Sequence, residues 1–178
     1  MHILETKRLL LRPFYHTDLD DVYEYSKNEN VGPNAGWPPH RSKQESWETM
    51  QDVFLDKEDI WAIEIKELCK VIGSIGIIDD PKRQNPKTKM LGYSIGEPYW
   101  GLGYMTEAVE RVLAYAFLEK NSSLVSAYCY PFNHRSQRVL EKNKFQYEGL
   151  LRQAEKMYHG EVFDNLCFSV TKEEYLSL

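Results

Sequence analysis

The segment from Gly92 to Ala108 constrains the fold more than any other part of the chain. It begins as an apolar strand pattern, which Pro98 ends, and passes through Gly101 and Gly103 directly into a helical pattern. The first backbone N–H groups of such a helix have no partner within the helix, and the positive end of its dipole lies behind them. Such a terminus binds anions, and the glycines let a phosphate approach the backbone. Taken alone, two glycines in a turn are more often structural, and the motifs of an ATP or dinucleotide site are absent.

Helix and strand patterns alternate along the whole chain. Helix patterns, with apolar residues three and four apart, cover about residues 17–27, 42–54, 103–120 and 133–143. Strand patterns, rich in β-branched and aromatic residues, cover 8–13, 60–65, 71–78, 90–97, 124–130, 145–155 and 161–170. No repeat or low-complexity linker interrupts them. The sequence therefore predicts one α+β domain over residues 1–178, with a mixed, mainly antiparallel sheet.

The composition is that of an ordinary globular chain. Its 178 residues suffice for one core, and 22 basic against 27 acidic residues give a formal charge of −5. A general nucleic-acid binder carries a basic surplus, and no apolar run is long enough to cross a membrane, so neither partner is expected. The first residues do not match an export signal, and the three cysteines form no metal-binding cluster. We therefore expect a cytoplasmic protein without a metal.

The glycine turn resembles the acyl-CoA-binding motif of the GNAT acetyltransferase superfamily, written Gln/Arg-x-x-Gly-x-Gly/Ala. The matching residues are Trp100, Gly103 and Met105. Trp100 stands in place of Gln or Arg, and Met105 in place of a small residue. The phosphate contacts of that motif are backbone N–H groups, which these residues also supply. The motif Tyr-Trp-Gly-x-Gly-Tyr-x-Thr-Glu-Ala is typical of the branch that acetylates the N-terminal alanine or serine of ribosomal proteins.

Two further blocks extend the resemblance over almost the whole chain. Residues 133–145 resemble the family's Asn-x-x-Ser-x-x-Val-Leu-Glu-Lys-x-Gly-Phe helix, and residues 5–12 resemble the first strand of the same branch. Lys144 replaces the usual glycine, so we expect the helix to end in a tighter or less left-handed turn. The resemblance implies a single-domain GNAT-like fold, whose mixed sheet splays at a central cleft and is flanked by helices.

The resemblance also implies where the co-substrate acetyl-CoA would bind. The backbone of Tyr93, Ser94 and Ile95 would pair with its pantetheine arm like an added strand. Its pyrophosphate would lie on the backbone amides of the glycine turn, namely those of Gly101, Leu102, Gly103, Tyr104, Met105 and Thr106. Asn133 would hydrogen-bond the pantetheine or its loop, and could equally be only a helix N-cap.

Attack of an amine on a thioester involves two proton transfers, and the resemblance suggests a residue for each. Leu140 stands where many family members have a catalytic tyrosine. In the ribosomal-protein branch a serine takes that role, and Ser136 matches it, stabilising the leaving thiolate by a hydrogen bond. The alternative for Ser136 is a local hydrogen bond in the first helical turn. Glu155 matches the general base of the branch, and its alternative is a solvated carboxylate at a strand end.

The acceptor amine is less constrained than the cofactor. Trp37 and His40 lie in the proline- and glycine-rich loop 28–41, where this fold builds its acceptor entrance, so they are the expected acceptor contacts. We expect an N-acetyltransferase that acts by direct attack in a ternary complex, with a protein N-terminal α-amine, as on a ribosomal protein, as acceptor. The alternatives are a small amine (polyamine, amino acid or aminoglycoside) and a non-catalytic acyl-CoA sensor. The aromatic loops of the chain are also compatible with a homodimer.

Overall fold

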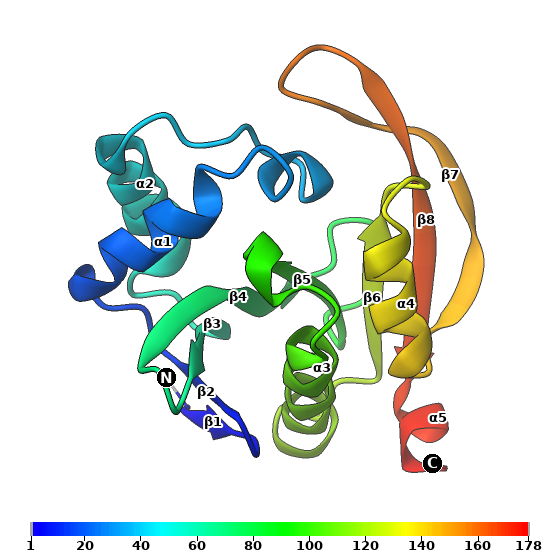
Figure 1. The fold of residues 1–178 in the computed structure, drawn as a ribbon. Helices are drawn as coiled ribbons and strands as arrows, with labels where there is room; N and C mark the ends of the chain where they lie inside the picture. Colours follow the sequence, from blue (N-terminus) through cyan, green and yellow to red (C-terminus); the bar gives the residue numbers. More distant parts are fainter. Residues whose placement is uncertain (1, 178) are drawn as a thin grey trace. The chain divides into compact units, whose positions relative to one another are not determined.

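The computed structural model describes residues 2–177, in which eight strands form one mixed sheet (Figure 1). The strand order is β1-β2-β3-β4-β5-β6-β8-β7. β5 runs parallel to β6, whereas the pairs β1–β2, β2–β3, β3–β4, β6–β8 and β7–β8 are antiparallel. The predicted α+β class with a mixed, mainly antiparallel sheet is confirmed.

The strands are β1 (Leu4–Glu5), β2 (Leu9–Arg12), β3 (Ile60–Ile65), β4 (Lys70–Asp79), β5 (Thr88–Ile95), β6 (Leu124–Cys129), β7 (Gln146–Lys156) and β8 (Val162–Thr171). The α-helices are α1 (Leu19–Ser26), α2 (Lys43–Thr49), α3 (Tyr104–Ala114), α4 (His134–Lys142) and α5 (Lys172–Leu176). One-turn π-helical segments continue α2 through Met50–Phe54 and α3 through Tyr115–Glu119. Short 3₁₀ turns cover His16–Asp18, Gly32–Asn34 and Glu97–Tyr99.

The described chain divides into two compact units that are interleaved in sequence. Unit 1 comprises residues 2–76 and 93–108, and unit 2 comprises residues 77–92 and 109–177. The single domain expected over residues 1–178 remains a prediction, and its two end residues, 1 and 178, lie outside the described residues.

Unit 1 builds its core between α1, α2 and the strands β2 to β4. Buried side chains of α1, β3, β4, the π-helical segment and the adjoining loops form one apolar cluster, made of Phe14, Val22, Tyr25, Val31, Met50, Leu55, Ala62 and Val71. Beside it, the buried Arg12 guanidinium donates to both carboxylate oxygens of Asp18, each at 2.8 Å, and to Glu64. Burial of these charges is tolerated because each one is paired and hydrogen-bonded.

Unit 2 is built around β6, with β8 and then β7 on one side; β7 and β8 form the long orange-to-red hairpin of Figure 1. On the other side, Thr88–Leu91 of β5 lie opposite Leu124–Ala127. The fully buried Asp80 carboxylate accepts hydrogen bonds from the hydroxyls of Ser126 (2.5 Å) and Tyr128 (2.9 Å). These bonds attach the loop that follows β4 to the middle of β6.

The largest differences from the predicted elements lie at short or bent segments. β5 begins and ends two residues earlier than the predicted 90–97, because Glu97 and Pro98 already form a 3₁₀ turn. β1 was not predicted, since two residues carry no periodicity and the strand depends on its pairing with β2. α5 was not predicted either; a capping box between Thr171 and Glu174 starts this five-residue helix.

The end of α4 contradicts the expectation for Lys144. This residue has φ of 64°, which is left-handed. The N–H of Phe145 donates to the carbonyl of Leu140 (3.1 Å) and the N–H of Lys144 to that of Glu141 (3.0 Å), the pattern of a Schellman motif. The two hydrogen bonds and the buried Phe145 ring therefore hold the ordinary helix exit, although the residue in the left-handed position has a Cβ.

Candidate functional site

The glycine turn between β5 and α3 has the backbone of an anion site. Gly101 and Gly103 both have left-handed φ values, 76° and 82°. The N–H of Glu107 makes the first intrahelical bond of α3, to the carbonyl of Gly103 at 3.1 Å, so the amides of Tyr104 and Met105 precede the helical ladder. A Cβ at Gly101 would meet nothing within 4 Å, so the space beside its backbone is open. Leu102 is exposed, Met105 is buried and Thr106 is half-buried.

Two residues that sequence reasoning missed hold this turn in place. Arg8 donates from Nε to the Glu107 carboxylate (2.6 Å) and from Nη1 to the carbonyl of Leu102 (3.0 Å), and its guanidinium lies 4.2 Å from the Tyr104 ring centroid. Glu107 also accepts from the Thr6 hydroxyl at 2.6 Å. Burial alone would raise the pKa of Glu107, but these hydrogen bonds and the Arg8 charge lower it overall. The sequence alone did not indicate this pairing, because Arg8 and Glu107 lie 99 residues apart in the chain.

The end of β5 is held rigidly against β4. The N–H of Gly96 donates to the carbonyl of Ile72 at 2.8 Å, and the hydroxyls of Ser74 and Ser94 lie 3.0 Å apart. A Cβ on Gly73 would lie only 2.2 Å from the carbonyl oxygen of Ser94, so glycine is required for this close approach. The predicted pantetheine-binding residues Tyr93, Ser94 and Ile95 are all half-buried.

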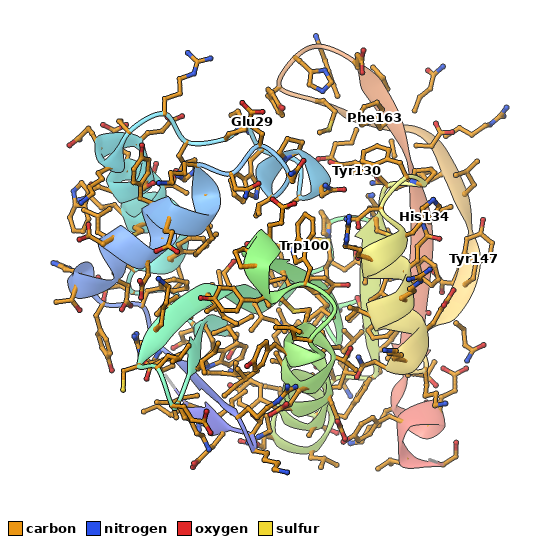
Figure 2. The ribbon with its side chains drawn as sticks, in the orientation of Figure 1. Glu29, Trp100, Tyr130, His134, Tyr147 and Phe163 are labelled. Atoms are coloured by element: carbon orange, nitrogen blue, oxygen red, sulfur yellow. The ribbon has the colours of Figure 1, made fainter. Side chains whose placement is uncertain are left out.

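Trp100 has a structural task that its place in the motif did not reveal. Its indole Nε1–H donates to the carbonyl of Ile95 at 2.8 Å, which ties the end of β5 to the beginning of the glycine turn. The ring also packs on the unit 1 core cluster. Figure 2 labels this side chain. A tryptophan therefore fixes the shape of the turn, whereas the usual Gln or Arg could not fill the same apolar contact.

The loop 28–41 is anchored to the same turn through Glu97. The side-chain amides of Asn28 and Asn30 donate to the Glu97 carboxylate, at 2.8 and 3.0 Å. Farther along the loop, the rings of Trp37 and His40 lie 5.3 Å apart, so the structure brings the two predicted acceptor contacts together.

His40 is less accessible than its place in a loop suggests. It is 8% exposed, its Nδ1 lies 2.7 Å from the hydroxyl of Ser46, and its backbone N–H donates to Ser26 at 2.9 Å. Burial lowers the pKa of His40, and the charge of Glu45 only partly opposes that shift. The ring is therefore neutral at neutral pH, and its acceptor-binding role stays a prediction.

In unit 2, Asn133 and Ser136 meet at the beginning of α4. The side-chain oxygen of Asn133 accepts the backbone N–H of Ser136 at 3.1 Å, so Asn133 is the helix N-cap. Ser136 is half-buried. The pKa of the Cys129 thiol is raised to about 11, chiefly by burial, and Ser136 partly opposes this shift. Neither observation tests the predicted cofactor or catalytic roles.

Glu155 lies on β7, directly opposite Phe163 of β8. Its side chain is exposed, and its negative charge acts on the Tyr130 hydroxyl. Burial raises the pKa of Tyr130, and the negative charge of Glu155 raises it further. Ser136 and Glu155 therefore influence the pKa values of Cys129 and Tyr130, which are consecutive residues of the chain.

Within residues 2–177, no three His, Cys, Asp or Glu side chains gather as a metal site would require. In the same residues, no helix combines the length and apolar character needed to cross a membrane.

Solved structures share this fold over almost the whole chain. The acetyltransferase (GNAT family) from Bacillus anthracis has a TM-score of 0.86 at 22% identity, covering 97% of this chain and 100% of that one. The ribosomal-protein-S5-alanine acetyltransferase from Vibrio fischeri reaches 0.76 at 20% identity (98% and 99% covered). The spermidine N-acetyltransferase from Vibrio cholerae, in complex with CoA and spermine, reaches 0.78 at 20% (96% and 99%). At these identities the likeness shows the fold alone.

Sequence comparison supplies the family. The family model described as an acetyltransferase (GNAT) domain matches residues 8–146. The uncharacterized N-acetyltransferase p20 from Bacillus licheniformis is 32% identical over 181 residues, which cover 98% of this chain and 99% of that protein. Both matches include the glycine turn, and together with the eight-stranded fold they confirm the expected superfamily. The chain belongs to the GNAT family of N-acetyltransferases.

Proposed function

We propose that this chain transfers the acetyl group of acetyl-CoA to a protein N-terminal α-amine, such as that of a ribosomal protein, by direct attack in a ternary complex. The observation that carries the proposal is the glycine turn, where two left-handed glycines precede the first intrahelical bond of α3. Backbone amides at a helix N-terminus bind phosphate without basic side chains. This suits a chain whose formal charge is −5 and whose cofactor is a polyanion.

The residues present fit the cofactor. The open space beside Gly101 leaves room for a phosphate at the backbone, and the amides from Gly101 to Thr106 are the proposed donors. Tyr93, Ser94 and Ile95 supply strand backbone for the pantetheine, and Asn133 is proposed to contact it in addition to its capping role. When bound, acetyl-CoA supplies an activated thioester, so that no covalent acyl-enzyme is required.

The proposed proton transfers fall on two side chains of unit 2. Glu155 is exposed, and its carboxylate is proposed to accept the proton that the acceptor ammonium must lose. Ser136 is proposed to donate a hydrogen bond to the leaving thiolate. A serine hydroxyl is a poor acid, so this role suits it better than giving up its proton. Trp37 and His40 are proposed to line the acceptor entrance. We also propose a cytoplasmic location and a homodimer.

A second acceptor class is a small amine, and it is favoured by one observation. The solved structures that share this fold include both a ribosomal-protein-S5-alanine acetyltransferase and a spermidine N-acetyltransferase, at equal sequence identity. A non-catalytic acyl-CoA sensor is the third alternative, and the presence of both Ser136 and Glu155 argues against it.

The test is thiol release from acetyl-CoA with a panel of acceptors, comparing peptides that begin with Ala or Ser with polyamines, amino acids and aminoglycosides. Turnover of the peptides alone supports the proposal, and turnover of polyamines alone assigns the small-amine class. CoA binding without thiol release on any acceptor identifies a sensor.

Gly101→Val should abolish CoA binding, because it adds a branched side chain at a φ of 76°. Gly160→Val is the matched control, with φ of 94° and open space around it.

A further inference from the structure

Three aromatic rings gather in unit 2 where β6 ends and β8 begins. The ring of Tyr130 lies 5.3 Å from that of Phe132 and 5.5 Å from that of Phe163, and the last two lie 5.3 Å apart. Figure 2 shows Tyr130 and Phe163 beside each other. Tyr130 is buried, but Phe132 remains 49% exposed. Packing of the hairpin therefore uses only part of this aromatic surface, and about half of Phe132 stays exposed.

A carboxylate belongs to the same group of side chains. Glu155 pairs with Phe163 across β7 and β8, and directly opposed residues of an antiparallel pair project from the same face of the sheet. Its negative charge also raises the pKa of the Tyr130 hydroxyl. An exposed carboxylate thus projects from the same face of the sheet as the Phe163 ring.

The combination of ring faces and a carboxylate selects one kind of ligand. The face of an aromatic ring carries negative electrostatic potential and attracts cations, most effectively where water is partly excluded. The carboxylate adds a full negative charge and repels anions. We propose that Glu155, Tyr130, Phe132 and Phe163, here called the aromatic–carboxylate cluster, bind an organic ammonium ion, namely the charged amine of the acceptor.

The inference rests on the proposed function in one respect, because it takes the acceptor amine as the natural ligand. It adds the element that recognises this acceptor: the rings hold the alkylammonium group against Glu155. The bound ammonium then loses one proton to that carboxylate, which leaves a carboxylic acid and a neutral amine with its lone pair available. Acceptors are therefore selected as cations before they react as neutral amines.

The test uses a pair of probes that have the same shape and differ in charge, choline and 3,3-dimethylbutan-1-ol. Binding is measured without acetyl-CoA, by following the ring resonances of the protein in an NMR titration. We expect the native protein to bind choline about fivefold more tightly than the alcohol, as a partly exposed cation–π site does. Phe132→Leu should weaken choline binding by about threefold while leaving the alcohol unaffected. Glu155→Gln should abolish most of the preference for the charged probe.

Tyr147→Leu is the matched control, because Tyr147 is an exposed ring of β7 that packs on Phe168 (5.5 Å) outside the cluster. Its choline affinity should equal that of the native protein. Equal binding of choline and the alcohol by the native protein would overturn the proposal, and so would native choline affinity in a folded Phe132→Leu protein. Phe132 is half-exposed, so this variant retains the fold where Phe163→Leu could lose it. Choline binding without thiol release would support the cluster and refute the proposed function. Thiol release without a preference for choline would support the proposed function and refute the cluster.

Discussion

Glu107 is the side chain whose removal should most clearly affect the glycine turn. Its carboxylate accepts three hydrogen bonds, from the Thr6 hydroxyl (2.6 Å), the Arg8 backbone N–H (2.9 Å) and Arg8 Nε (2.6 Å). Hydrogen bonds to a charged group contribute about 1.5–3 kcal/mol each, against about 1 kcal/mol for neutral pairs. Glu107→Gln keeps one oxygen acceptor and removes the charge. The Arg8 side chain is 39% exposed, so solvent screens the ion pair, and we expect a loss of about 2 kcal/mol in unfolding free energy at neutral pH.

The pH dependence of that loss is the sharper test. The pKa of Glu107 is lowered from its ordinary 4.5, because the bonds from Thr6 and Arg8 outweigh the effect of burial. A carboxyl group with a depressed pKa in the folded state contributes stability above its unfolded-state pKa, and this contribution is lost as the pH falls through the folded-state pKa. The difference between native protein and Glu107→Gln should therefore be complete at neutral pH and shrink as the pH falls below 4.5.

Urea unfolding at a series of pH values measures this difference directly. Glu5→Gln is the control, since Glu5 pairs with Lys66 at the surface and should change stability little at any pH. A Glu107→Gln difference that is absent at neutral pH, or constant across the whole series, would refute the reasoning that the charge of Glu107 holds the turn.

Three further changes test other parts of the structure. Lys144→Gly should raise the unfolding free energy by about 0.5–1 kcal/mol, since relief of left-handed strain (about 1–2) exceeds the entropic cost of glycine (about 0.5–1); a lower urea midpoint contradicts this. Trp100→Phe keeps the apolar contact but loses the hydrogen bond to Ile95, which contributes about 1 kcal/mol. The KM for acetyl-CoA should rise several-fold with kcat nearly kept, and an unchanged KM in steady-state kinetics counts against that role. Asp80→Ala should cost about 3 kcal/mol in thermal unfolding, because buried donors such as Ser126 lose their acceptor; a loss under 1 kcal/mol would show that the loop has other anchors.

The sequence predicts best where a pattern is local. β3 occupies Ile60–Ile65 as predicted, because β-branched and aromatic residues there are bounded by turn residues on both sides. The N-cap at Asn133 also follows from a residue type and its spacing to Ser136. The family resemblance located the glycine turn, which no periodicity alone would have distinguished from an ordinary structural turn.

Prediction fails where the determining contact is distant in the chain. Nothing near Glu107 in sequence indicates that Arg8 is its partner, and only folding brings the two together. The contact of His40 is closer in the chain, with Ser46 six residues on, but it lies in the next helix and not in the loop that contains His40. Lys144 was mispredicted because residue type was given more weight than the hydrogen bonds that close the helix.

The interleaving of the two units has a consequence for synthesis of the protein. Unit 1 possesses all its residues once position 108 has left the ribosome, although the segment 77–92, which belongs to unit 2, has already emerged. That segment cannot find its partners until residues 109–177 follow, so for a time Thr88–Leu91 are exposed without the β6 strand that pairs with them. The chain crosses from one unit to the other three times, and a single proteolytic cut therefore cannot release either unit as one continuous fragment.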